Sequence, residues 1–144
     1  MLLFYFLWYK LTLDIMIKLR GLHHIAIICS DYLKSKDFYV RILGFEAIRE
    51  VYRAERKSYK LDLALDGDYL IELFSFPDPP SRVSRPEACG LRHLAFGVEN
   101  LEKSCRELAD FGVMTEPIRL DELTGKKFTF FSDPDGLPIE LYQL

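Results

Sequence analysis

The feature of this sequence that most constrains its fold is an internal repeat. Residues 22–27 (LHHIAI) correspond to residues 91–96 (LRHLAF), which lie 69 positions later. With one residue of slippage, residues 71–74 (IELF) align with residues 139–142 (IELY). Self-similarity at a fixed spacing indicates one supersecondary unit used twice. A chain of 144 residues is short enough for both units to share one core.

Each unit has the pattern of one strand, one helix and three further strands. An apolar run opens each unit, and a helix N-capping residue follows it, Asp31 in the first unit and Asn100 in the second. Gly44 and Gly112 are suitable residues to end these helices. Alternating apolar residues then predict strands, the last two joined by a turn containing Asp-Gly. The predicted strands are residues 22–30, 45–53, 59–65 and 69–76, then 91–98, 113–120, 127–132 and 137–143. The pattern predicts an α+β fold built from two tandem βαβββ modules.

We divide the chain at a proline-rich stretch, residues 77–89, which is typical of a linker across the surface. The first module then covers residues 21–76 and the second covers residues 90–144. Residues 1–20 form an N-terminal arm that we expect to be non-native or flexible. Met16 is a plausible natural start, which makes residues 1–15 an upstream extension.

Composition and charge exclude several classes of function. A formal net charge of -3, with no basic stripe, disfavours nucleic acid as a partner. The longest apolar run, Met1 to Tyr9, is far shorter than the ~20 residues that cross a bilayer, so we expect no membrane association. The three cysteines form no C-x-x-C pair and no even set, which favours a reducing, cytoplasmic location.

One histidine in each unit has small or aliphatic neighbours on its own face of the first strand. Successive strand residues point to opposite faces, so His24 shares a face with Ala26 and Ile28. By the same argument His93 shares a face with Ala95 and Gly97. The adjacent His23 corresponds to an arginine in the second unit, so we select His24.

Each unit also carries one glutamate inside an apolar run, Glu72 in the first and Glu140 in the second. A lone carboxylate there is costly unless a cation pairs with it or it coordinates a metal. Core histidines and an edge-strand glutamate are the ordinary alternative, but the duplication of all four positions favours a metal site. Two imidazoles and two carboxylates suit Ni, Co, Mn or Fe, and Zn if its coordination number expands. The predicted metal ligands are His24, Glu72, His93 and Glu140.

These motifs resemble the vicinal oxygen chelate superfamily, which is also called the glyoxalase and dioxygenase superfamily. The resemblance covers residues 22–142 and is greatest to the small bacterial glyoxalase I-like proteins of the YaeR type. It implies curved mixed sheets, or a partly open barrel, around a metal site, and a homodimer. It rests on His24-Ile25-Ala26-Ile27 with Asp31, Phe38-Tyr39, Leu43-Gly44-Phe45, Ile71-Glu72-Leu73, Gly90-Leu91-Arg92-His93, Asp133-Pro134-Asp135-Gly136 and Ile139-Glu140.

The resemblance implies a lyase or isomerase of glyoxalase I type that acts on a small-molecule substrate. Such an enzyme isomerises a 2-oxoaldehyde–thiol adduct by proton transfer, while one divalent metal ion stabilises the enediolate oxygens. Glutamates of the metal site supply the base, and we expect Glu140 in that role before Glu72. The sequence leaves open whether the four ligands come from one chain or from two.

Several alternatives on substrate and reaction stay open. Ile28 and Phe76 stand where glutathione-dependent members carry an arginine and an asparagine, so another thiol adduct, or a small oxo or hydroxy compound, is an alternative substrate to the glutathione conjugate. Arg82 and Arg85 of the linker either bind an anionic substrate or are plain solvated side chains. Residues 128–131 either line an apolar pocket or, as we prefer, pack as an ordinary strand. The competing functions are an extradiol-type dioxygenase and a non-catalytic small-molecule binding protein of the same superfamily.

Overall fold

The computed structural model describes residues 17–144, so the predicted extension at residues 1–15 lies outside the described part. The first module contains β1 (Ile25–Cys29), α2 (Tyr32–Asp37), the π-helical turn η1 (Phe38–Ile42), β2 (Glu46–Arg53), the 3-10 turn η2 (Ala54–Arg56), β3 (Ser58–Leu65) and β4 (Asp68–Ser75). The second contains β5 (Leu94–Val98), α3 (Leu101–Asp110), β6 (Arg119–Leu120), β7 (Lys127–Ser132) and β8 (Pro138–Gln143). This order confirms the predicted α+β fold. No helix among residues 17–144 is long and apolar enough to cross a membrane.

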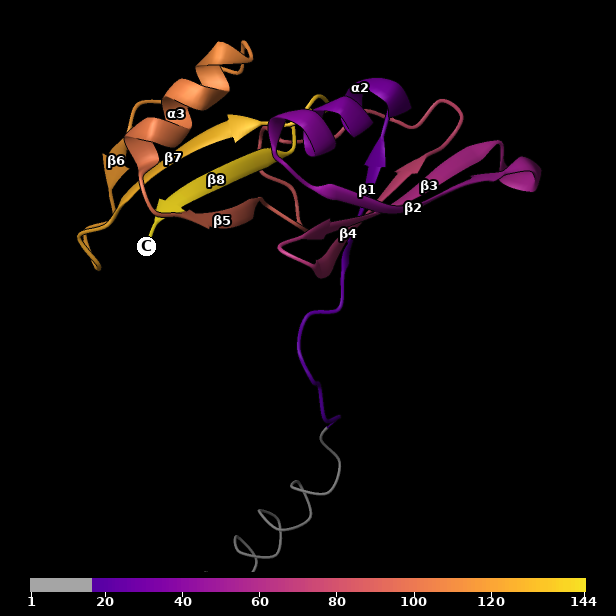
Figure 1. Ribbon diagram of the computed structural model, residues 1–144, viewed down its shortest axis with the longest axis horizontal. Coiled ribbons are helices and arrows are strands. Elements are labelled where there is room, and N and C mark those ends of the chain that lie inside the picture. The colour runs from indigo at the N-terminus through magenta and orange to yellow at the C-terminus, as the bar shows by residue number, and fades with distance from the viewer. Residues whose placement is uncertain (1–16) are drawn as a thin grey trace, which may run out of the picture.

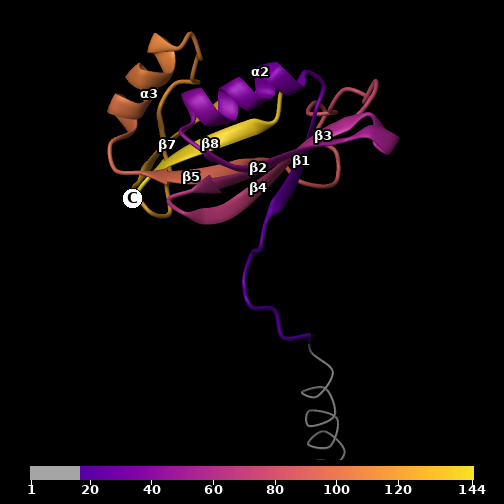
Figure 2. The same ribbon diagram turned by 45° about the vertical axis from the view of Figure 1, so that its right-hand side comes forward.

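Each module forms a four-stranded mixed sheet. The strand orders are β1-β4-β3-β2 and β5-β8-β7-β6, and in both sheets the first strand runs parallel to the last strand of its module. Asp66 and Gly67 both have positive φ, at 52° and 85°, as a two-residue hairpin turn between β3 and β4 requires. The two sheets lie side by side, and α2 and α3 cover the same face (Figures 1 and 2).

The predicted elements differ from the structure in three places. Residues 113–118 are irregular, and only Arg119–Leu120 of the predicted strand 113–120 is a strand. Pro117 has no backbone N–H to donate to a ladder, which weakens strand pairing there. The first helix ends as a π-helical turn, and the strands β1 and β5 begin one residue after His24 and His93.

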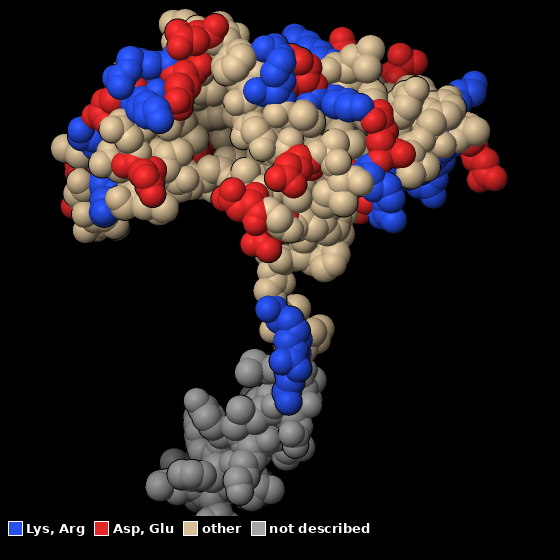
Figure 3. All heavy atoms as spheres, viewed as in Figure 1, with Lys and Arg blue, Asp and Glu red and all other residues tan. Residues whose placement is uncertain are grey.

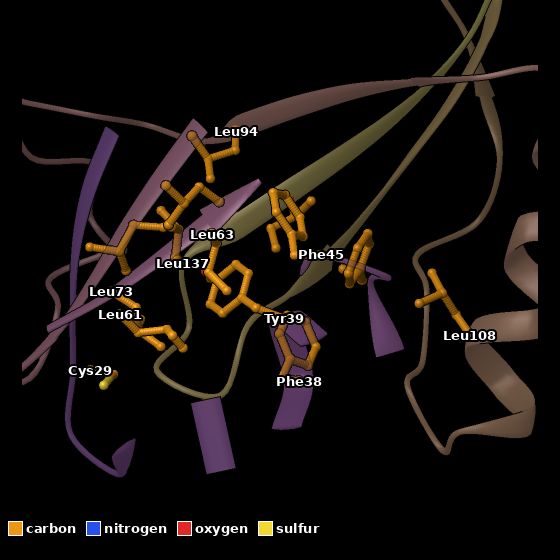
Figure 4. Close-up of a cluster of buried hydrophobic side chains, with 14 of the residues drawn as sticks. Cys29, Phe38, Tyr39, Phe45, Leu61, Leu63, Leu73, Leu94, Leu108 and Leu137 are labelled. Carbon is orange, nitrogen blue, oxygen red and sulfur yellow. The ribbon is translucent and has the colours of Figure 1, made fainter. Parts of the chain in front are cut away.

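One hydrophobic core joins the two modules. Figure 4 shows Tyr39 of η1 beside Leu63 of β3 and Leu137, which precedes β8. The Tyr39 hydroxyl donates to Asp133 Oδ2 at 2.9 Å, so a buried polar contact also crosses the junction. The modules are therefore fixed relative to each other by packing and by hydrogen bonding.

Candidate metal centre

Within each module the sheet register places one predicted histidine beside one predicted glutamate. His24 Nε2 lies 3.3 Å from Glu72 Oε2, and His93 Nε2 lies 3.1 Å from Glu140 Oε2. In both cases the histidine precedes a strand that pairs, in parallel, with the strand that carries the glutamate. We call His24 with Glu72 the first half-site and His93 with Glu140 the second half-site.

Both half-sites lie on the face of the sheets that the helices leave open. Ile71 and Leu73 are buried in the core, so Glu72 between them points to the opposite face. The same alternation holds in β8, where both neighbours of Glu140 are buried in the core. The helices α2 and α3 lie on the core side (Figures 1 and 2). Figure 3 shows the open side hollowed between the two modules.

The geometry of each half-site fits two adjacent positions of a metal coordination sphere. Two donors at about 2.1 Å from an ion and at right angles to one another are about 3 Å apart. The two nitrogen–oxygen separations match this spacing. Within residues 17–144, however, no three His, Cys, Asp or Glu side chains are grouped to hold one ion. One chain thus brings the four predicted ligands together as two pairs.

The first half-site is held by polar neighbours. Glu72 Oε1 accepts hydrogen bonds from Lys60 Nζ and from the Tyr69 hydroxyl, both at 2.5 Å, which leaves Oε2 facing the imidazole of His24. Partial burial raises the pKa of Glu72, but these hydrogen bonds outweigh burial and leave the pKa below its usual value. His24 Nδ1 lies 2.8 Å from His23 Nδ1. In the tautomer that donates this hydrogen bond, Nε2 is free to bind a metal.

The second half-site has apolar surroundings. Phe130 stands directly across from Glu140 in the sheet and packs edge-on against the His93 ring, with 5.2 Å between ring centroids. Among residues 17–144, only His93 contacts the Glu140 carboxylate with a polar side-chain atom. The two carboxylates therefore differ: Glu72 is fastened through its second oxygen, and Glu140 is free to rotate away from its imidazole.

Sequence reasoning missed the groups that fasten the first half-site, which are Lys60, Tyr69 and His23. The signal was present, because β3 pairs antiparallel with β4 and places Asp62 opposite Glu72. Alternation then puts Lys60 on the same face. Asp62 binds the same ammonium at 2.7 Å, so one lysine links two carboxylates.

Sequence comparisons identify the family. Residues 21–141 match the Glyoxalase/Bleomycin resistance protein/Dioxygenase superfamily, and the chain belongs to it. The chain is 68% identical over 125 residues to the uncharacterised protein YwkD of Bacillus subtilis (strain 168), covering 87% of this chain and 98% of that protein. It is 59% identical over 128 residues to the uncharacterised protein YaeR of Escherichia coli (strain K12), covering 89% and 99%.

Solved structures agree with this membership. A glyoxalase family protein from Enterococcus faecalis superposes with a TM-score of 0.80 at 52% identity, covering 85% of this chain and 97% of that one. The trypanothione-dependent glyoxalase I of Leishmania major superposes with a TM-score of 0.67 at 28% identity, covering 87% of each chain. The fold is therefore shared with a glyoxalase I at low sequence identity.

Proposed function

We propose that this protein is a metal-dependent lyase of glyoxalase I type that isomerises a small 2-oxoaldehyde–thiol adduct. The observation that carries the proposal is that the carboxylates of Glu72 and Glu140 differ in their polar side-chain contacts. Glu72 is restrained by Lys60 and Tyr69, as a permanent metal ligand should be, whereas Glu140 has only His93 as a polar side-chain neighbour among residues 17–144. Family membership and the likeness to a glyoxalase I support the same reaction class.

We further propose that two copies of the chain complete each metal centre. Each half-site supplies one nitrogen and one oxygen, which is half of a four-ligand set. In a symmetric dimer the first half-site of one protomer would face the second half-site of its partner, and a two-fold axis generates two equal centres. A metal centre shared between two protomers would explain the homodimer that the resemblance implies.

Glu140 is the proposed base. The reaction removes a proton from the carbon beside a carbonyl and returns a proton to the neighbouring carbon. A bound divalent cation, one of Ni, Co, Zn, Mn or Fe, would supply stabilisation of negative charge on the substrate oxygens. Glu140 would accept the proton through the carboxylate oxygen that faces His93 and then donate it to the adjacent carbon. Phe130, which pairs with Glu140 across the sheet and packs edge-on against the His93 ring, gives this carboxylate an apolar neighbour.

The direct test compares Glu140→Gln with Glu72→Gln after reconstitution with each metal, using methylglyoxal and several low-molecular-weight thiols. Glu140→Gln should lose about 10²–10⁴-fold in turnover because the base is gone, while retaining much of the metal. Glu72→Gln should lose metal, since its carboxylate is the fastened ligand. Glu55→Gln, an exposed position in η2, is the control and should behave as wild type. Full activity of Glu140→Gln removes it as the base. Oxygen consumption without isomerisation contradicts the proposed reaction.

A further inference from the structure

A cleft of about 840 Å³ lies at the junction of the two modules, beside the second half-site. Its walls come from the linker, α2, η1, residues 112–119 and the turn between β7 and β8. His93 lines one part of the cleft, so the cavity reaches one predicted ligand of the second half-site. Cavities of this size hold small organic ligands.

The charged side chains of the cleft leave an excess of positive charge. Its carboxylates are already engaged: Asp37 pairs with Arg41, Glu87 with Arg92, and Glu116 with Arg119. The remaining carboxylate, Asp133, is buried and accepts hydrogen bonds from Tyr39 and two backbone N–H groups. Within residues 17–144, the lining cations with no carboxylate partner are Lys34, Arg82 and Arg85.

Hydrogen bonds of Arg82 and Ser84 fix the linker beside the second half-site. Arg82 donates to the carbonyl oxygens of Leu91, at 2.5 Å, and Arg92, at 3.1 Å, which immediately precede His93. Ser84 Oγ donates to the Gly136 carbonyl at 3.1 Å and ties the linker to the turn between β7 and β8. Arg85 follows this anchored segment and has no hydrogen-bond or ion-pair partner among the described residues.

Much of the remaining wall is apolar. Phe38, Ile42 and Val83 line the cleft together with Met114 and Phe130. An organic molecule with an apolar body and an anionic group suits this lining better than a free inorganic anion, which would gain nothing from the apolar wall.

We infer that this cleft binds the anionic end of the substrate, a carboxylate-bearing or phosphate-bearing thiol adduct, with Arg85 and Lys34 as the charge contacts. That the bound ligand is the substrate rests on the proposed function. That the cleft binds an organic anion is independent of that function. Arg82 acts by holding the linker in place. The reacting end of the substrate then lies at His93 and Glu140.

The test measures binding to the metal-free protein by calorimetry, using S-benzylmercaptosuccinate as the dianionic probe and its dimethyl ester as the neutral one. The dianion should bind at least about tenfold more tightly than the ester, because only the dianion can form charge-assisted hydrogen bonds with Arg85 and Lys34. Arg85→Gln should weaken dianion binding about tenfold, and adding Lys34→Gln should weaken it further. The ester should be unaffected. Arg56→Gln, an exposed arginine at the far end of the first module, is the matched control.

Kinetics supply a second readout. With a carboxylated thiol adduct of methylglyoxal, Arg85→Gln should raise KM and leave kcat unchanged, whereas with the 2-mercaptoethanol adduct neither constant should change. Equal binding of dianion and ester, or wild-type binding by the Arg85→Gln and Lys34→Gln double variant, overturns the inference. If no adduct turns over and the dianion still binds through Arg85, the proposed function fails while the anion site stands.

Discussion

At the scale of single residues, the repeat has kept the ligand types and changed what surrounds them. Glu72 and Glu140 occupy equivalent strand positions, but Lys60 and Asp62 stand beside the first where Phe128 and Phe130 stand beside the second. The polar neighbours restrain the carboxylate of Glu72. The aromatic neighbours leave the carboxylate of Glu140 free to rotate. Under the proposed function, this divergence would give one metal centre two carboxylates with separate roles.

Lys60→Met tests the fastening of Glu72. Lys60 lowers the pKa of both Glu72 and Asp62 against the opposing effect of burial. A lowered carboxyl pKa stabilises the folded protein above the ordinary pKa, and this stabilisation is lost as pH falls through the folded-state pKa. Lys60→Met should therefore lower the free energy of unfolding by about 1–3 kcal/mol at neutral pH, and the deficit should shrink in acid.

Denaturant titrations over a pH series measure this effect, and NMR of the metal-free variant should show the pKa of Glu72 moved upward. Lys126→Met, at an exposed lysine with no ion pair in the described chain, is the control and should change little. A deficit of the same size in acid as at neutral pH would mean that Lys60 acts by packing alone.

At the scale of elements, local patterns predicted most strands and both helix starts. Asp31 and Asn100 each cap a helix through the side chain, as their position suggested. Most of the predicted strand 113–120 was wrong, and only Arg119–Leu120 forms a strand, because Pro117 interrupts the alternating pattern. The turn at residues 133–136 was expected, but its contacts with the first module were not. Tyr39 and Asp133 are 94 positions apart, and no local pattern reports such a pair.

Tyr39→Phe tests that junction. The change removes the hydroxyl that donates to the buried Asp133 and leaves one carboxylate oxygen without its donor. Burial already raises the pKa of Asp133, against the hydrogen bonds from backbone N–H groups and Tyr39, and the variant should raise it further. The expected loss in unfolding free energy is about 1–3 kcal/mol, measured by denaturant titration. Tyr52→Phe, at an exposed tyrosine, should cost almost nothing; equal losses in the two variants would contradict a role for this hydrogen bond.

At the scale of the whole molecule, the repeat selected the four predicted ligands but did not predict how they are arranged. The structure places His24 beside Glu72 and His93 beside Glu140, a pairing that the sequence analysis did not predict. In the proposed dimer, the way the two half-sites come together depends on how one protomer packs against the other. Strand periodicity carries no information about that packing. The separation into two half-sites is the feature from which we propose a dimer.

The most direct test mixes two variants, His24→Ala and His93→Ala, by unfolding and refolding them together. In a dimer that shares its centres, each variant alone has no intact centre. A mixed dimer has one intact centre, built from the second half-site of the His24→Ala chain and the first half-site of the His93→Ala chain. Statistical mixing should therefore restore about a quarter of the tight nickel or cobalt sites of wild type, measured by equilibrium metal binding. Metal binding that stays absent on mixing, or that persists in either variant alone, would contradict the shared centre.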